Sequence, residues 1–203
     1  IRERFMVTDR IGQSIEEKSR AFIAADRVLA SNHTLPAEFV EQANQENLRT
    51  AKITYFDTML FAGDEMQLGS VKAVSNTYPL KGELKVKTSL TGQPQVTSDI
   101  PSRGEVWLSE SVFYALTLKV GDKVELGAVT FTASHVVAEE PDAPFNVFSS
   151  SQRILINEAD IAVIEVIHSG SRHIYRQLYA CDKANLDTFY EWLKPQMKQN
   201  QLC

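Results

Sequence analysis

Apolar residues repeat with a helical period at both ends of the chain. Near the C-terminus they recur at spacings of three and four, which predicts an amphipathic helix over residues 184–200. A spacing of four near the N-terminus, with polar residues between, predicts a helix over residues 1–20. The positions that mark the two faces are Leu186, Phe189, Tyr190, Leu193 and Met197 at one end, and Val7, Ile11, Ile15 and Phe22 at the other.

A strand and a second helix are expected after the first helix. Residues 24–30 have the apolar content of a strand and end at Ser31-Asn32. Pro36 suits the first turn of a helix that runs to Asn47, with Thr34 as the expected cap.

Residues 52–75 have the composition of a long β-hairpin. Its two arms, 52–61 and 66–75, are rich in β-branched and aromatic residues, which a pleated surface favours. Ala62-Gly63-Asp64-Glu65 lies between them and supplies the turn.

The middle of the chain consists of short apolar stretches separated by turn residues. Ser109 and Asn157 each precede a short helical stretch and are expected caps. The two ends and the middle together predict an α+β fold. Both termini (residues 1–78 plus 174–203) form one α/β lobe, and residues 79–173 form a small β-rich lobe inserted into it. The predicted short strands are 84–88, 105–108, 123–126, 129–137, 153–156 and 174–181.

The two lobes are joined where the pattern changes, in VKAVSNTYPLKGEL (Val71 to Leu84). We expect the chain to leave the first lobe at Tyr78-Pro79, to turn at Gly82, and to return near His173. If the lobes move relative to one another, these four residues are the expected hinge.

Residues 139–151 form the longest stretch with no predicted element, and long loops of this kind are usually functional or mobile. Its apolar residues either pack beneath the loop or offer a contact to a lipid or a protein partner. They are Phe145, Val147 and Phe148. Its carboxylates are expected to face solvent, with a general acid/base pair as the alternative. They are Glu139, Glu140 and Asp142.

Charge and motifs exclude several classes of function. The net charge is −5 and no stripe of lysine and arginine occurs, so nucleic-acid binding is not expected. The sequence lacks the nucleophile elbow of serine hydrolases, the glycine-rich phosphate loops and the paired ligands of zinc sites. We therefore predict no catalytic, cofactor-binding or metal-binding residues.

Two cysteines, Cys181 and Cys203, flank the predicted last helix. That helix spans roughly 25 Å at about 1.5 Å per residue, whereas a disulfide needs Cα atoms within about 7 Å. We expect two unpaired thiols. No apolar run approaches the roughly 18–20 residues that cross a bilayer, and the chain begins at Ile1, so we expect it to be a piece of a longer protein.

Three passages resemble one family in the same order. The passage from Val71 to Leu84 is similar to the "vkAV…YPLrGel" passage of YbbP-type ABC transporter permeases. GEVWLSESVFYALTLKVGDKVELG (Gly104 to Gly127) resembles the following passage of that group, and a looser form recurs across the MacB/FtsX-like superfamily. Leu178 to Leu193 resembles the closing strand and helix of the same extracytoplasmic domain. Trp192 lies where family members vary, so no role is carried to it.

This resemblance implies a non-catalytic periplasmic domain between the first two transmembrane helices of a permease at the bacterial inner membrane. It implies a porter-like α/β lobe with an inserted Sabre-like lobe. The ATPase would be a separate cytoplasmic subunit, whose work reaches the periplasmic lobes through the transmembrane helices. A lipid-like or other hydrophobic substrate, or a periplasmic partner such as a thioesterase/lysophospholipase, would be the object of that motion.

Two alternatives remain open. One is a periplasmic hydrolase or esterase whose Ser and His residues are assembled only by the fold, since such sites are defined by geometry. The other is a purely structural adaptor that docks a periplasmic protein.

Overall fold

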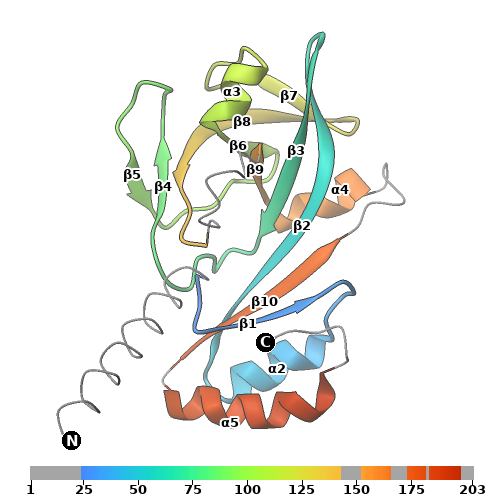
Figure 1. Cartoon of the computed structure of the whole chain (residues 1–203), viewed down its shortest axis with the longest axis vertical. Coiled ribbons are helices and arrows are strands. Elements are labelled where there is room, and N and C mark those ends of the chain that lie inside the picture. The colour runs from blue at the N-terminus through green and yellow to red at the C-terminus, as the bar shows by residue number, and fades with distance from the viewer. Residues whose placement is uncertain (1–23, 143–151, 166–172, 182, 198–203) are drawn as a thin grey trace, which may run out of the picture.

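The computed structural model describes residues 24–142, 152–165, 173–181 and 183–197 (Figure 1). The helix expected over residues 1–20 lies outside the described residues. Among the described residues, no helix combines the length and the apolar character needed to cross a bilayer.

The predicted long hairpin is confirmed, and it runs along most of the molecule in Figure 1. It consists of β2 (Arg49–Ala62) and β3 (Glu65–Val74), paired in register from Ile53 opposite Val74 to Ala62 opposite Glu65. The turn requires a positive φ of 60° at Gly63, which glycine adopts without a steric penalty. The lower half of β2 pairs with β10 (Ile174–Ala180), and its upper half reaches β7 (Lys123–Leu126).

Six strands close into a barrel around the upper half of this hairpin. The order is β2, β3, β9 (Arg153–Asn157), β6 (Glu105–Ser109), β8 (Val129–Glu139) and β7, which returns to β2. The pairs β3–β9 and β6–β8 are parallel and the others are antiparallel. The sequence predicted these strands but not the closure, which rests on a short pairing of Leu60 with Leu126 and Phe61 with Glu125.

The barrel is filled by apolar side chains from every strand and from α3 (Glu110–Ala115), which packs Val112 and Phe113 into it. Closing the sheet removes most of its exposed edges. α4 (Ile161–Glu165) follows β9 after a single 3-10 turn, and its Ile164 joins the same core. The other members of this core include Phe56, Leu60, Val71, Val106, Leu108, Val124, Phe131, Val136, Ile154 and Ile156.

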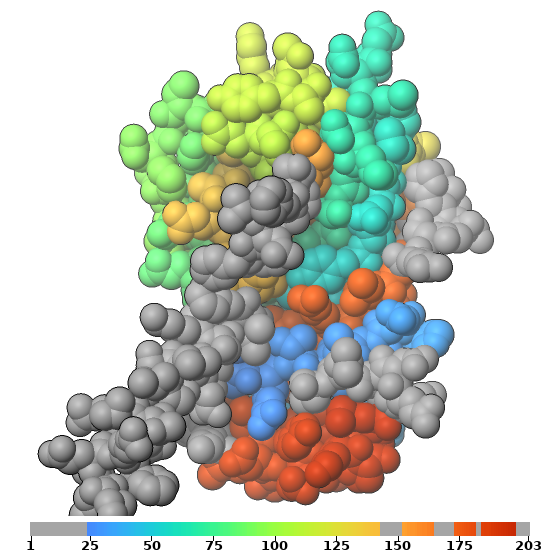
Figure 2. All heavy atoms as spheres, viewed as in Figure 1, coloured from blue at the N-terminus to red at the C-terminus, as the bar shows by residue number. Residues whose placement is uncertain are grey.

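A second layer lies below the barrel in Figure 1, where two helices cover a small antiparallel sheet. β1 (Arg27–Ser31) pairs with β10, and α2 (Ala37–Gln45) and α5 (Lys183–Leu193) pack side by side against this sheet. Figure 2 shows α5 covering that end of the molecule. Their shared core consists of Leu29, Phe39, Ala43, Leu48, Tyr179, Leu186, Phe189 and Leu193.

The last helix confirms the predicted apolar face but is shorter than expected. Leu186, Phe189 and Leu193 are all buried. α5 ends at Leu193 and continues only as a 3-10 turn over Lys194–Gln196. Pro195 explains this end, since proline has no backbone N–H and its ring clashes with the preceding turn of an α-helix.

Two of the three predicted helix caps are corrected. The residue before α2 is Pro36, and no side chain caps that helix, so Thr34 is not its cap. Ser109 does precede α3, but its hydroxyl accepts a hydrogen bond from the Arg153 backbone N–H at 3.1 Å and does not cap the helix. Asn157 caps as predicted, because its side chain accepts from the Ala159 N–H at 3.0 Å.

A third apolar cluster lies between the barrel and the helical layer. It is covered by β4 (Leu84–Lys87), which pairs with β8 and forms a hairpin with β5 (Gln95–Thr97). Leu84, Trp107 and Tyr78 are among its buried members. The division into residues 1–78 plus 174–203 and residues 79–173 stays a prediction. The hairpin β2–β3 belongs to the first of these lobes and also supplies two strands of the barrel.

Candidate functional site

Lys72 is a buried lysine in the centre of the molecule. It lies on β3 within a run of buried residues, and its side chain is only 9% exposed. An isolated buried ammonium is very costly, so such a group must be paired and hydrogen-bonded. Its Nζ contacts Glu140 Oε1 at 3.1 Å and Asp142 Oδ1 at 2.5 Å.

The sequence predicted that Glu140 and Asp142 face solvent, and this prediction is wrong. Their side chains are 4% and 3% exposed, respectively. Of the three carboxylates in this stretch, only Glu139 is exposed, and it pairs with Lys85 at the surface. The prediction was wrong because the sequence does not indicate that these two carboxylates pair with Lys72, about 70 positions earlier.

Arg153 and Tyr78 complete this buried cluster. Arg153 Nη1 lies 2.7 Å from Glu140 Oε2, so two cations balance two carboxylates. Lys72 donates to the Tyr78 hydroxyl at 2.7 Å, and Tyr78 in turn donates to Asp142 Oδ1 at 2.6 Å. We call Lys72, Glu140, Asp142, Arg153 and Tyr78 the ion cluster.

The electrostatics of the ion cluster favour its charged form. Burial lowers the pKa of Lys72. The interactions of its ammonium with Glu140, Tyr78, Tyr55 and Asp142 outweigh burial and hold that pKa well above its usual value. Burial alone would raise the pKa of Asp142, yet the Lys72 ammonium and hydrogen bonds bring it below its usual value. Burial raises the pKa of Tyr78 well above its usual value, so the phenol stays protonated and donates.

The crossing at Tyr78 to Gly82 is held at several points. Tyr78 is 1% exposed and belongs to the ion cluster, and Leu80 is also buried. Lys81 forms an ion pair with Asp26 at 2.5 Å. Gly82 has a φ of +79°, which side-chain-bearing residues rarely adopt. The hinge role of Tyr78, Pro79, Gly82 and His173 stays a prediction.

Asp26 joins the start of the described chain to the end of β10. Its N–H donates to the Tyr179 carbonyl at 3.0 Å, and its Oδ2 accepts from the Cys181 N–H at 3.2 Å. Since its other oxygen holds Lys81, one carboxylate joins the start of β1, the end of β10 and the crossing between the proposed lobes.

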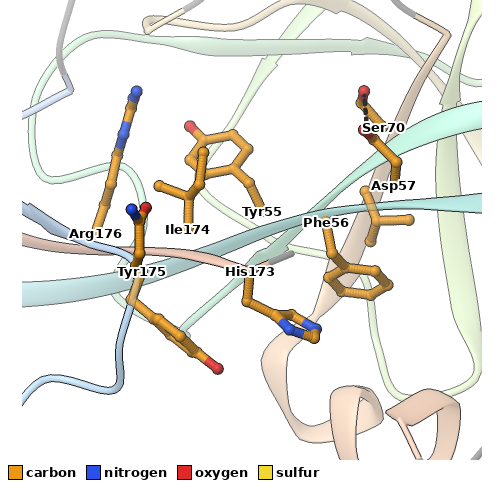
Figure 3. Close-up of a pocket in the computed structure, with 10 residues that line it drawn as sticks. Tyr55, Phe56, Asp57, Ser70, His173, Ile174, Tyr175 and Arg176 are labelled. Carbon is orange, nitrogen blue, oxygen red and sulfur yellow. Dashed lines mark hydrogen bonds between the residues drawn. The ribbon is translucent and has the colours of Figure 1, made fainter. Parts of the chain in front are cut away.

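A hollow of about 790 Å³ lies beside the ion cluster, where β10 begins alongside β2 (Figure 3). We call it the first hollow. Tyr55 links the two features, since it lines the hollow and its hydroxyl donates to Asp142 Oδ2 at 3.3 Å. Burial raises the pKa of Tyr55 to about 12. In Figure 3, Tyr55 and Arg176 extend to one side of the strands and Phe56 and His173 to the other.

The first hollow has a mixed lining. The Arg176 guanidinium lies 4.9 Å from the centre of the Tyr55 ring, and the His173 ring lies 5.3 Å from that of Phe56. The Ser70 hydroxyl donates to Asp57 at 2.6 Å. Aromatic faces and a few fixed polar groups are the usual composition of a small-molecule site.

The residues predicted to contact a partner, Phe145, Val147 and Phe148, lie outside the described residues. So does Cys203, while Cys181 is a free thiol. Within the described part of the chain, no group of three or more His, Cys, Asp and Glu side chains is arranged to hold a metal ion.

One serine, one histidine and one carboxylate do meet within the described residues, on β8 and β6. The Ser134 hydroxyl donates to Glu105 Oε2 at 3.2 Å, and His135 Nδ1 lies 3.1 Å from the same hydroxyl. The serine therefore lies between the histidine and the carboxylate. A hydrolase triad needs the reverse order, with histidine between the serine and the acid. This contact therefore does not activate Ser134.

Comparison with known proteins gives the family context. No protein-family model matches the chain. It is 35% identical over 195 residues to the uncharacterized ABC transporter permease YbbP of Escherichia coli K12, a match that covers 96% of this chain. The chain is a domain related to the YbbP permease. It spans only 23% of the length of that relative.

Two solved structures have a similar fold. The periplasmic region of MacB from Actinobacillus actinomycetemcomitans matches with a TM-score of 0.54 at 14% identity, over 86% of each chain. The extracellular domain of the noncanonic ABC-type transporter YknZ from Gram-positive bacteria matches with a TM-score of 0.52 at 9% identity, covering 82% of this chain and 87% of that one. These likenesses establish a MacB-like fold, as the sequence resemblance predicted.

The role of Lys72 as a structural centre was not predicted from the sequence. A signal was present, because Lys72 is the only charged residue in the apolar run from Val71 to Val74. Strands with parallel neighbours are commonly buried on both faces, so a charge within such a run predicts a buried partner. The sequence did not reveal which carboxylate that partner would be.

Proposed function

We propose that the chain is a non-catalytic extracytoplasmic domain of an ABC transporter permease, at the periplasmic face of the bacterial inner membrane. Its role is to pass the motion of transmembrane helices, driven by a separate cytoplasmic ATPase, to a hydrophobic substrate or a periplasmic partner. The observation that carries this proposal is the 35% identity to the YbbP permease over nearly the whole chain. The MacB-like fold supports it.

Transmission of motion requires stiff connections between distant segments, and the ion cluster supplies one. It joins β3, the crossing at Tyr78, the segment after β8 and the start of β9. Asp26 supplies another between the start of β1, the end of β10 and Lys81. Movement applied at the helical layer is therefore passed into the barrel through paired charges and through the continuous hairpin β2–β3.

We assign the contact with a lipid-like substrate to the first hollow, together with Phe145, Val147 and Phe148. The aromatic rings of Phe56 and Tyr175, which extend to the same side of the strands in Figure 3, support this assignment. The thioesterase/lysophospholipase remains a proposed partner, suggested by the family resemblance alone.

Reconstitution of the parent permease with its ATPase in proteoliposomes tests the coupling role. Two readouts are needed: ATP hydrolysis, and ATP-dependent release of a fluorescent phospholipid from the membrane. Removal of residues 24–197 should leave hydrolysis and abolish release. Lys72→Met should lower release per ATP hydrolysed, while Lys85→Met, which affects only a surface pair, should not. Unchanged lipid release without the domain would refute the proposed coupling.

An esterase assay on the 203-residue chain separates the transmission role from the hydrolase alternative. We expect no turnover of a p-nitrophenyl ester above the background of the heat-denatured chain. Robust turnover that Ser134→Ala abolishes would overturn the non-catalytic assignment.

A further inference from the structure

A second hollow, of about 440 Å³, lies beside β6 and β8. It is bordered by the turn after β3, the segment between β5 and β6, and the strands β6 and β8. Its chemistry is carried by Asp99, Glu105, Trp107 and His135. We call it the second hollow.

The two hollows differ in charge. The first is lined by Asp57 and Arg176, whose charges balance. The second is lined by Asp99 and Glu105, and no lysine or arginine is among the described residues that line it. This unbalanced negative charge in a concave site favours a cation.

The aromatic wall of the second hollow supplies an independent indication of a ligand. Trp107 is 3% exposed, and its Nε1–H has no hydrogen-bond partner among the described residues. A buried donor without an acceptor is costly and rare in folded proteins. An acceptor oxygen of a bound molecule would satisfy it.

His135 lies on the same wall. Its ring packs against Trp107 with centroids 4.9 Å apart. Its Nδ1 lies 3.1 Å from the Ser134 hydroxyl. Asp99 and Glu105 thus offer acceptors, while Trp107 offers a donor and a π face of the kind that attracts cations.

We propose that the second hollow binds a primary ammonium group that carries an oxygen acceptor a few bonds away, as in an amino amide. The N–H donors of the ammonium are accepted by the carboxylates of Asp99 and Glu105. The carbonyl oxygen accepts from Trp107 Nε1. This site is separate from the proposed contact with a hydrophobic substrate, and it stands or falls independently of the transport role.

The experiment uses the indole N–H signals of the ¹⁵N-labelled 203-residue chain. The sequence has two tryptophans, and Trp192→Phe assigns the signal of Trp107. Glycinamide, titrated into the millimolar range, should shift the Trp107 signal downfield and saturably while the Trp192 signal stays in place. Acetamide, which has the carbonyl but no ammonium, should produce no saturable shift.

Two variants test the proposed contacts. Asp99→Asn with Glu105→Gln removes both charges, while the new amide oxygen at position 105 still accepts from Ser134. This double variant should weaken glycinamide binding at least about tenfold, as expected for charge-assisted hydrogen bonds. Asp57→Asn, in the first hollow, is the matched control and should bind as the wild type does. An unmoved Trp107 signal, an equal response to acetamide, or unchanged binding by the double variant would overturn the proposal.

Discussion

Lys72 Nζ and Asp142 Oδ1 lie 2.5 Å apart, although 70 positions separate the two residues in the sequence. The contact joins the end of the long hairpin to the segment that leaves the barrel after β8. Glu140 extends it to Arg153, which begins β9 on the far side of residues 143–151. The ion cluster therefore fixes both ends of the 139–151 segment, where the sequence predicts no element.

The first prediction concerns the loss of the buried ammonium. Lys72→Met keeps the length of the side chain and leaves Glu140 and Asp142 buried with Arg153 as their remaining cation. Removing one partner of a buried ion pair costs about 3–5 kcal/mol, because the other charge stays uncompensated. Urea unfolding followed by circular dichroism measures the free energy of unfolding.

Lys85→Met is the matched control for this change. Lys85 pairs with Glu139, whose side chain is 61% exposed, so solvent screens the pair and its contribution is small. Its free energy of unfolding should stay near that of the wild type. Equal losses of unfolding free energy in Lys72→Met and Lys85→Met would show that Lys72 is not the centre of a buried cluster.

The second prediction is a pH dependence that originates in Asp142. Its folded pKa is lowered, so its stabilising contribution is present above the unfolded value of about 3.9 and is lost as pH falls through the folded pKa. The stability difference between the wild type and Asp142→Asn should be constant near neutral pH and should shrink below about pH 4.

The pH dependence of stability that originates in Lys72 has the opposite sign. Its folded pKa is raised, so its contribution is present below the unfolded value of about 10.4 and is lost only as pH rises through the folded pKa. The ion cluster is thus at full strength across the neutral range. Urea unfolding at a series of pH values measures both effects, and a difference that grows toward acid pH would contradict the assignment of Asp142.

The third prediction concerns the contact between β3 and β9. A Cβ built on Gly69 would lie 2.4 Å from Ile154 Cδ1 and 3.2 Å from the Gln152 carbonyl oxygen. Gly69→Ala should therefore destabilise the protein by about 1–3 kcal/mol through overpacking. Ile154→Val removes Cδ1 and should relieve part of this loss when the two changes are combined.

A double-mutant cycle measures that relief as a favourable interaction energy between Gly69→Ala and Ile154→Val. Gly104→Ala is a useful comparison, because a Cβ there meets nothing within 4 Å and any cost comes from its positive φ alone. Additive effects of the first two changes would place the overpacking elsewhere.

Local patterns in the sequence predicted the helices and strands well, but they could not predict which distant residues pair. The spacing of Leu186, Phe189 and Leu193 identifies a helix face because those residues are neighbours on the helix itself. Barrel closure depends on Leu60 meeting Leu126, and the ion cluster depends on Lys72 meeting Asp142. In both cases one partner alone gives no indication of which distant residue will pair with it.

The last prediction returns to Phe145 and Phe148, which the sequence suggests as a contact surface. If they contact a partner, the double change Phe145→Ala with Phe148→Ala should leave the melting temperature of the free chain nearly unchanged, because no packed core is lost. Phe113→Ala is the matched control, since Phe113 is fully buried in the barrel. Truncation of a buried phenylalanine costs about 3–5 kcal/mol. A comparable loss in the double variant would place Phe145 and Phe148 in the core and leave the first hollow as the proposed contact for a hydrophobic substrate.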